Sequence, residues 1–254
     1  MVATVDSLRT ALERDGFAII PAFLPTEPCE RLGEAIVGEC DRLVEAGWKF
    51  VGGGRWEGNR NVIPGAAGIA VWDAAVASGL AELIGAATGQ TLAATALGGN
   101  LAMPGGRAQN FHIDGAFDTP SWVANIALTA TDASNGMTAL VPGSHRTAQS
   151  YSAFRHGGSE RLAVQPRMEP GDVLVRLSTV WHRGMVNLSS RPRPMALISY
   201  RAAQDVAVPF APVPGMPLTI CANRYYGKGA VIRELAAVNA PWFYEGLRRW
   251  RSPR

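Results

Sequence analysis

Short runs of β-forming residues, cut by turns rich in Gly and Pro, fill the middle of this chain and limit its possible folds more than any other feature. These runs lie at 91–102, 108–113, 121–131, 137–142, 172–177 and 195–202. Strands of this length and spacing are typical of an antiparallel barrel or sandwich of the jelly-roll type. We therefore predict a mainly β protein whose core spans about 91–205.

The first 90 residues have a different pattern, in which apolar residues recur at helical spacing. Residues 4–14 and 27–46 are predicted to be amphipathic helices on either side of a short buried strand at 16–20, and helix signals return at about 74–88. Residues 50–68 are rich in Gly and Asn and show no period, so we predict a long loop. Loops of this length inside a compact domain are often functional.

The organisation of the chain is predicted to be simple. Composition does not change sharply anywhere, and no internal repeat is visible. We expect one domain over 1–254, with the helical part, 1–90, packed outside the β core and a C-terminal extension at 206–254.

Charge and cysteine usage restrict the partners and the compartment. The net charge is only +3, and the one basic cluster, in the last seven residues, is best explained as a solvated terminus, so no nucleic-acid partner is expected. No apolar run reaches the roughly 18 to 20 residues of a membrane span. The three cysteines are widely spaced without a C-x-x-C pair and are expected to be thiols. We predict a cytoplasmic protein without membrane contact.

A candidate metal site comes from two distant segments. His112 and Asp114 are two apart in a predicted strand and therefore point to the same side, and His182 lies at the end of a separate hairpin. Two imidazoles and one carboxylate on one side of a metal are the ligand set of non-haem Fe(II) sites. The H-x-D tripeptide alone is unspecific, so its surroundings decide.

An arginine follows the second histidine at a useful distance. Arg193 stands just before the β-like run 195–202, where a guanidinium on a neighbouring strand can bind a carboxylate through two hydrogen bonds. Such a residue would hold a dicarboxylate beside the metal. Arg183, Arg191 and Arg201 are alternatives, of which Arg191 is the runner-up.

At this point the chain resembles the phytanoyl-CoA dioxygenase family of Fe(II)/2-oxoglutarate oxygenases. Each shared motif is short, but their order and spacing along most of the chain are specific. The motifs are Asp15-Gly-Phe-Ala-Ile-Ile20 with Phe23-Leu24, His112-Ile113-Asp114, Asn135-Gly136-Met137, Val141-Pro-Gly-Ser-His-Arg146, Pro170-Gly171-Asp172, His182, Asn187 and Arg193.

This resemblance implies a fold, cofactors and residue roles. It implies a double-stranded β-helix core, Fe(II) held by His112, Asp114 and His182, and 2-oxoglutarate bound through its C5 carboxylate by Arg193, with O₂ as the oxidant. Relatives that halogenate have a small residue in place of Asp114, so hydroxylation, desaturation or oxidative ring closure is expected here. The family often has a small hydroxyl residue where this chain has Gly184, which leaves a second anchor for the carboxylate unassigned.

Other contacts to 2-oxoglutarate are predicted from strand faces. In the run 121–131, Asn125 and Thr129 share one face, opposite an apolar face that is the simpler choice for the core. If the polar face instead lines the cavity of a small barrel, Asn125 or Thr129 can help to hold the co-substrate. Gln109 and Asn100 are further candidates.

The substrate is the least constrained part of the prediction. Arg55 and Trp56 in the long loop, with Phe117 and Asp118 after the H-x-D, form a polar and aromatic set that suits a hydroxylated or sugar-like small molecule. A solvated loop with a packed tryptophan explains the same residues. The Arg-rich and Ala-rich composition suggests a bacterial enzyme that tailors natural products. Within the family that the chain resembles, oxygenases acting on aminoglycoside or oligosaccharide antibiotics would fit such a site.

Two other classes of function use the same residues. A jelly-roll protein that binds ligands without catalysis would keep the fold, although it would not need the intact set of ligands. A zinc hydrolase would use the two histidines and the aspartate. That second alternative gives Arg193 no task.

Overall fold

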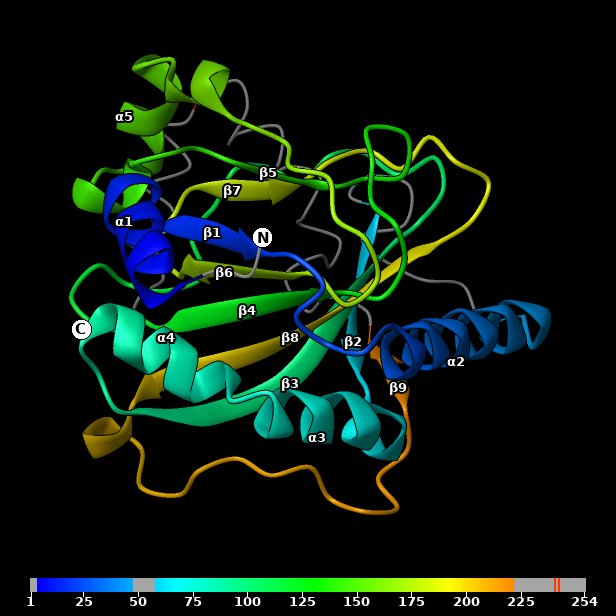
Figure 1. Cartoon of the computed structure of the whole chain (residues 1–254). Helices are drawn as coiled ribbons and strands as arrows, with labels where there is room; N and C mark the ends of the chain where they lie inside the picture. Colours follow the sequence, from blue (N-terminus) through cyan, green and yellow to red (C-terminus); the bar gives the residue numbers. More distant parts are fainter. Residues whose placement is uncertain (1–3, 48–57, 222–239, 241, 243–254) are drawn as a thin grey trace.

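The computed structural model describes residues 4–47, 58–221, 240 and 242. Arg55 and Trp56, predicted above to contact substrate, lie outside the described residues. The ranges below refer to the described part of the chain, which is shown as a cartoon in Figure 1.

The N-terminal segment forms two helices around one strand, as predicted. Helix α1 (Val5–Asp15) starts at Thr4, whose hydroxyl accepts from the amide of Ser7 while the Ser7 hydroxyl accepts in return from the amide of Thr4. Strand β1 (Phe17–Ile20) follows at once, and helix α2 (Thr26–Glu45) buries one side of its length. Local capping and helical spacing therefore specify this part of the fold.

The segment after α2 departs from the prediction. Residues 59–63, expected to belong to a loop, form strand β2 (Asn59–Ile63), and a 3₁₀ turn η1 (Gly65–Gly68) follows. The helix expected at 74–88 begins earlier and is two helices, α3 (Ile69–Ala77) and α4 (Leu80–Thr88). Gly79 divides them because it adopts the left-handed conformation, with φ of 67°.

A seven-stranded antiparallel sheet forms the larger half of the β core. Its order is β1-β6-β4-β8-β3-β2-β9. The strands not yet given bounds are β3 (Leu92–Ala102), β4 (Trp122–Ala127), β6 (Val173–Leu177), β8 (Arg193–Ala202) and β9 (Thr219–Cys221). Strands β1, β2 and β9 come from outside the predicted β range and extend the sheet at both edges.

A second, smaller sheet faces this one. Strand β5 (Thr138–Leu140) pairs with β7 (His182–Gly184), and isolated bridges add His112 beside His182 and Val164 beside Leu140. Successive segments between Leu92 and Ala202 thus alternate between two facing sheets. This arrangement is a double-stranded β-helix, the jelly-roll fold that was expected.

Short helical segments complete the fold. Between β5 and β6 lie η2 (Ser144–Arg146), α5 (Tyr151–His156) and η3 (Ser159–Leu162), and η4 (Ala203–Asp205) follows β8. In Figure 1, α3 and α4 lie beside β3 in the lower half of the molecule, whereas β5, β7 and α5 lie in the upper half.

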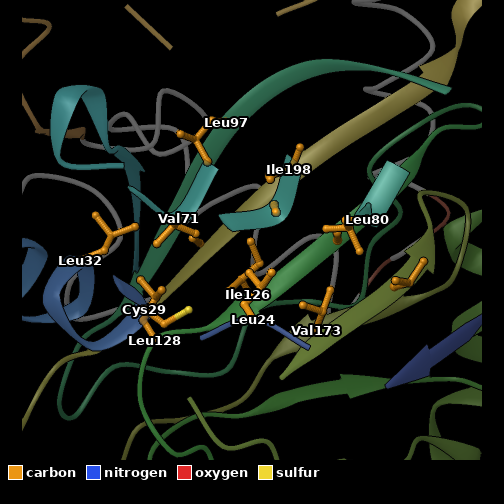
Figure 2. Packing of buried hydrophobic residues seen from close by; sticks show 14 of the residues in the cluster. Leu24, Cys29, Leu32, Val71, Leu80, Leu97, Ile126, Leu128, Val173 and Ile198 are labelled. Carbon is orange, nitrogen blue, oxygen red and sulfur yellow. The ribbon is translucent and has the colours of Figure 1, made fainter. Parts of the chain in front are cut away.

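The large sheet is buried on both faces. Its outer face meets the helices in one hydrophobic cluster, and Figure 2 shows Leu32, Val71 and Leu80 of α2, α3 and α4 gathered over strand residues such as Ile126 and Ile198. All six residues of β4 are buried. The apolar face is therefore core, and the polar face is buried as well because it lines the space between the two sheets.

A helix that crosses a membrane must be both long and apolar. Within the described ranges no single helix is long and apolar enough to cross a membrane. The pair Gly65–Ala77 and Leu80–Thr88, bent by 49°, has the length and composition of a span, as core helices of other proteins also do. Buried residues of this pair, such as Val71 and Leu80, belong to the hydrophobic core.

Candidate metal centre

The two histidines of the predicted site are direct neighbours across the small sheet. The amide of His112 donates to the carbonyl of His182 at 2.9 Å, and the amide of His182 donates back at 3.0 Å. This paired backbone brings the ring centroids to 4.3 Å. Asp114 follows on the same side of the chain, and its amide donates to the carbonyl of Ser178 at 2.8 Å.

The side-chain atoms of these three residues converge on one point. Asp114 Oδ1 lies 3.6 Å from His112 Nε2, and Asp114 Oδ2 lies 3.4 Å from His182 Nε2. One ligand atom from each residue falls within 4.8 Å of the others. Two nitrogens and a carboxylate oxygen at this separation are arranged as ligands of a single divalent metal.

Hydrogen bonds to the backbone fix the tautomer of both rings. His112 Nδ1 is 2.9 Å from the carbonyl of Asn110, and His182 Nδ1 is 2.9 Å from the carbonyl of Val180. A carbonyl oxygen can only accept, so each Nδ1 carries the proton and each Nε2 presents a lone pair to the centre. Both Nε2 atoms are therefore unprotonated and free to bind a metal ion.

Arg176 is part of this centre although the sequence did not indicate it. Its Nη2 donates to Asp114 Oδ2 at 2.5 Å, and its Nε donates to Asn125 Oδ1 at 3.1 Å. The residue lies in β6, in the otherwise apolar run Val173–Leu177, with its side chain only 3% exposed. A lone arginine inside an apolar strand is the signal that could have identified it, because buried charges need partners.

Charge and burial shift the pKa values of the ligands. Burial tends to raise the pKa of Asp114, but the Arg176 guanidinium and the two imidazoles outweigh it and hold that pKa well below its usual range. Burial, and then the same guanidinium, lower the pKa of His182 well below 6.5. Near neutral pH the carboxylate is therefore ionised and the His182 ring is neutral, as metal binding requires.

Arg193 lies at the start of β8 with its charge inside the protein. The side chain is fully buried; its Nη1 donates to Asn100 Oδ1 at 3.1 Å and its Nη2 to the carbonyl of Gly136 at 2.5 Å. Within the described ranges no carboxylate pairs with it, and its Nε has no hydrogen-bond partner. Burial lowers the pKa of Arg193 to about 10, so it remains a cation at neutral pH. Arg191, the runner-up, is exposed.

The other predicted co-substrate contacts fall into different environments. Asn125 faces the space between the sheets, but its oxygen is taken by Arg176. Asn100 holds Arg193. Thr129 lies beyond the end of β4 and is half-buried, and no contact among the described residues places it at the centre. The sequence did not show that Asn125 and Asn100 bind buried arginines, or that Thr129 lies outside the strand.

Gly184 makes room for two amide side chains. The oxygen of Gln109 accepts from the Gly184 amide at 2.8 Å. A Cβ at position 184 would lie 3.1 Å from that oxygen and 3.1 Å from Asn59 Nδ2. Strand pairing puts Asn59 opposite Ala102, which is itself opposite Arg193, so Asn59 and Arg193 share one face with a small residue between them.

The predicted substrate contacts Phe117 and Asp118 lie in the turn between Asp114 and β4. Phe117 is half-buried and Asp118 is exposed. They follow Asp114 by three and four residues, and their contact with substrate stays a prediction.

Comparison with known proteins identifies the family. The model of the phytanoyl-CoA dioxygenase (PhyH) family matches residues 12–195. The chain belongs to this family. Its members use Fe(II), 2-oxoglutarate and O₂, and the protein is therefore a non-haem iron dioxygenase whose His-Asp-His centre was described above.

Individual relatives are more distant. The chain is 32% identical over 112 residues to the dioxygenase cdmD of Talaromyces verruculosus, a match that covers 39% of this chain and 36% of that protein. The epimerase SnoN, solved with Fe³⁺, α-ketoglutarate and nogalamycin RO, superposes with a TM-score of 0.58 at 20% identity over 84% of this chain and 98% of its own. The carbocyclase SnoK from nogalamycin biosynthesis superposes with a TM-score of 0.60 at 17% identity. That match covers 86% of this chain and 99% of SnoK.

Proposed function

We propose that this enzyme is a tailoring oxygenase of bacterial natural-product biosynthesis that breaks a C–H bond of a small molecule. The observation that carries the residue assignment is the convergence of His112, Asp114 and His182 together with the buried cation Arg193. The similarity in fold to SnoN and SnoK supports the class of substrate.

In this proposal each described residue has a defined task. His112, Asp114 and His182 bind Fe(II), and Arg193, held in place by Asn100, binds the C5 carboxylate of 2-oxoglutarate. When bound, iron, 2-oxoglutarate and O₂ would supply an oxidation in which 2-oxoglutarate becomes succinate and CO₂. One oxygen atom of O₂ would enter succinate, and the other would enter the substrate as a hydroxyl group or leave as water with two hydrogens of the substrate. The protein orients these partners and excludes water from the buried side of the centre.

A second anchor for the carboxylate is proposed beside Gly184. The Asn59 amide lies next to Gly184 and on the same sheet face as Arg193. We assign it the place of the small hydroxyl residue that the family often has two residues after the distal histidine. Gln109, which is fixed by the Gly184 amide, is the alternative.

The outcome of the reaction is proposed only as a class. A carboxylate at Asp114 takes the position that halogenating relatives leave open, so we propose hydroxylation, desaturation or oxidative cyclisation. Phe117 and Asp118, with Arg55 and Trp56, are the proposed contacts to a hydroxylated, sugar-like or aminoglycoside-like substrate. The buried thiols Cys29 and Cys40 agree with a reducing compartment, and we propose the cytoplasm.

An anaerobic binding experiment tests the assignment. Addition of Fe(II) and 2-oxoglutarate to the wild type should give the visible charge-transfer band of a chelated keto acid. An Asp114→Ala/His182→Ala double variant should give none. Absence of the band in the wild type, or its persistence in the double variant, would reject the proposed centre; tight Zn²⁺ binding with hydrolysis of an ester probe would favour the zinc alternative.

The substrate class is tested separately. Succinate formation should rise when the correct small molecule is added to enzyme, Fe(II), 2-oxoglutarate and O₂. A panel of polyketide glycosides, aminoglycosides and oligosaccharides distinguishes the proposed classes, and mass spectrometry of the product distinguishes addition of oxygen from loss of two hydrogens.

A further inference from the structure

Arg176 lies at the centre, yet neither the family pattern nor the proposed function uses it. Its guanidinium is buried in the space between the two sheets, against Asp114. Its Nη1 is buried without a hydrogen-bond partner among the described residues. A charge in such a place is costly unless it has a specific task or a very good partner.

Arg176 engages only one of the two carboxylate oxygens of Asp114. Arg176 Nη2 donates to Oδ2 of Asp114, and no hydrogen bond of the described residues engages Oδ1, which is the oxygen nearer to His112 Nε2. A guanidinium on one oxygen withdraws that oxygen's electron density from the metal. The other oxygen is then the better ligand.

The guanidinium cannot easily move away from this position. Its Nε donates to Asn125 Oδ1, and both side chains are buried. Strand pairing adds a backbone constraint, because Arg176 is opposite Val123 of β4 and opposite Phe17 of β1. Asn125 therefore fixes the direction in which Arg176 meets Asp114.

We infer that Arg176 is a positioning residue that restricts Asp114 to one-oxygen ligation and so keeps a coordination position of the iron open. Two histidines and one carboxylate oxygen leave three positions. Chelated 2-oxoglutarate takes two of them, and O₂ needs the third. If Asp114 bound through both oxygens, that third position would be filled.

This inference rests on the proposed iron centre, and the test separates the two. Nitric oxide is a stable probe of the open position, because it binds Fe(II) without turnover and gives a characteristic electron paramagnetic resonance signal. The charge-transfer band reports whether Fe(II) and 2-oxoglutarate bind at the centre. The nitric oxide signal reports whether the third coordination position of the iron is open.

The main variants are Arg176→Met and Arg176→Gln, which remove the charge, and Arg176→Lys, which keeps a donor for Oδ2. For Met and Gln we expect the 2-oxoglutarate band and iron binding to persist, because Asp114 still ligates through two oxygens. Nitric oxide binding should weaken about tenfold or more, a loss of the size that removal of a group orienting a metal ligand causes in metal affinity or activity. Arg176→Lys should retain most of the wild-type nitric oxide binding. Asn125→Leu should give an intermediate loss.

Arg155→Met is the matched control. Arg155 forms an ion pair with Glu160 in the α5–η3 segment, so the control also removes an arginine–carboxylate pair, but one with no described hydrogen bond or ion pair to His112, Asp114 or His182. Its band and its nitric oxide binding should equal those of the wild type.

The outcomes decide between roles. Wild-type nitric oxide affinity in the neutral Arg176 variants would overturn the inference. So would a parallel loss of iron affinity and melting temperature with the remaining position unchanged, because a purely structural or charge-balancing role predicts that result. Absence of the band in the wild type would reject the centre itself and not this inference alone.

Discussion

Arg193 is a cation that folding places in the interior without a described carboxylate beside it. Its two terminal nitrogens are held by neutral oxygens, from Asn100 and Gly136, which orient the guanidinium but do not neutralise it. Leaving a buried charge unpaired is destabilising by several kcal/mol. A dianionic co-substrate would supply the missing charge.

Substitution of Arg193 should therefore affect co-substrate binding more than iron binding. For Arg193→Ala we expect the 2-oxoglutarate concentration at half-maximal charge-transfer absorbance to rise about a hundredfold, the equivalent of about 2.8 kcal/mol. Arg191→Ala is the control, because Arg191 is exposed two residues away. A large effect in Arg191→Ala with none in Arg193→Ala would transfer the role to Arg191.

The ligand residues also predict how stability depends on pH. The folded-state pKa of His182 is lowered by burial, so below about pH 6.5 the unfolded chain takes up a proton that the folded chain does not. The folded-state pKa of Asp114 is also lowered, which adds stability above pH 3.8 that is lost on further acidification. The metal-free protein should lose stability as the pH falls from 7 to 5.

Urea denaturation at several pH values measures this dependence. His182→Asn should reduce the slope between pH 7 and 5, because its side chain does not titrate. An unchanged slope in His182→Asn would show that other groups cause the acid sensitivity.

At the scale of elements, the turn from α1 into β1 is packed directly against the segment that carries His182. Gly16 ends α1 with φ of 82°, and a Cβ there would overlap the His145 ring and lie 2.7 Å from Val180. The carbonyl of Val180 holds His182 Nδ1. The end of the N-terminal helix thus packs against the segment that holds His182.

Two glycine substitutions separate backbone strain from this packing. Gly89 ends α4 with φ of 69°, and no described atom lies within 4 Å of the place that a Cβ would take, so Gly89→Ala should cost only the left-handed strain, about 1 kcal/mol. Gly16→Ala should cost that amount plus about 1–3 kcal/mol for overpacking. If urea denaturation gave the same loss of unfolding free energy for both variants, His145 and Val180 would move aside at no energetic cost.

The elements that sequence reasoning found are those with local signals. Thr4 and Gly16 mark the ends of α1, and β3, β6 and β8 lie within or close to their predicted ranges. Strand β2 was missed because its pairing partners, β3 and β9, are far away in the chain and its own composition resembles a loop. Long-range pairing overrides weak local preference in such strands.

At the scale of the whole molecule, the clustering of His112, Asp114 and His182 was predictable because few residue types bind iron and the chain has only four histidines. The contact between Arg176 and Asp114 was not, because strand register brings Arg176 there; Asn125 was predicted as a co-substrate contact, and its bond to Arg176 was not. The sequence left open which face of β4 is core and whether its polar face lines a cavity. In the fold the polar face meets the space between two sheets, which only the closed β-helix creates.

Because the centre joins both sheets, ligand binding should stabilise the whole fold. Under anaerobic conditions, Fe(II) and 2-oxoglutarate at about 100 times their dissociation constants should each add about 2.7 kcal/mol to the free energy of unfolding. For a chain of this size each step raises the melting temperature by about 5–10 °C. Arg193→Ala should keep the step due to Fe(II) and lose most of the step due to 2-oxoglutarate, whereas Asp114→Ala/His182→Ala should lose both. Glutarate, which has the two carboxylates but cannot chelate through a keto group, should give a smaller step that still depends on Arg193. A full 2-oxoglutarate step in Arg193→Ala would mean that the buried cation is neutralised by something other than the co-substrate.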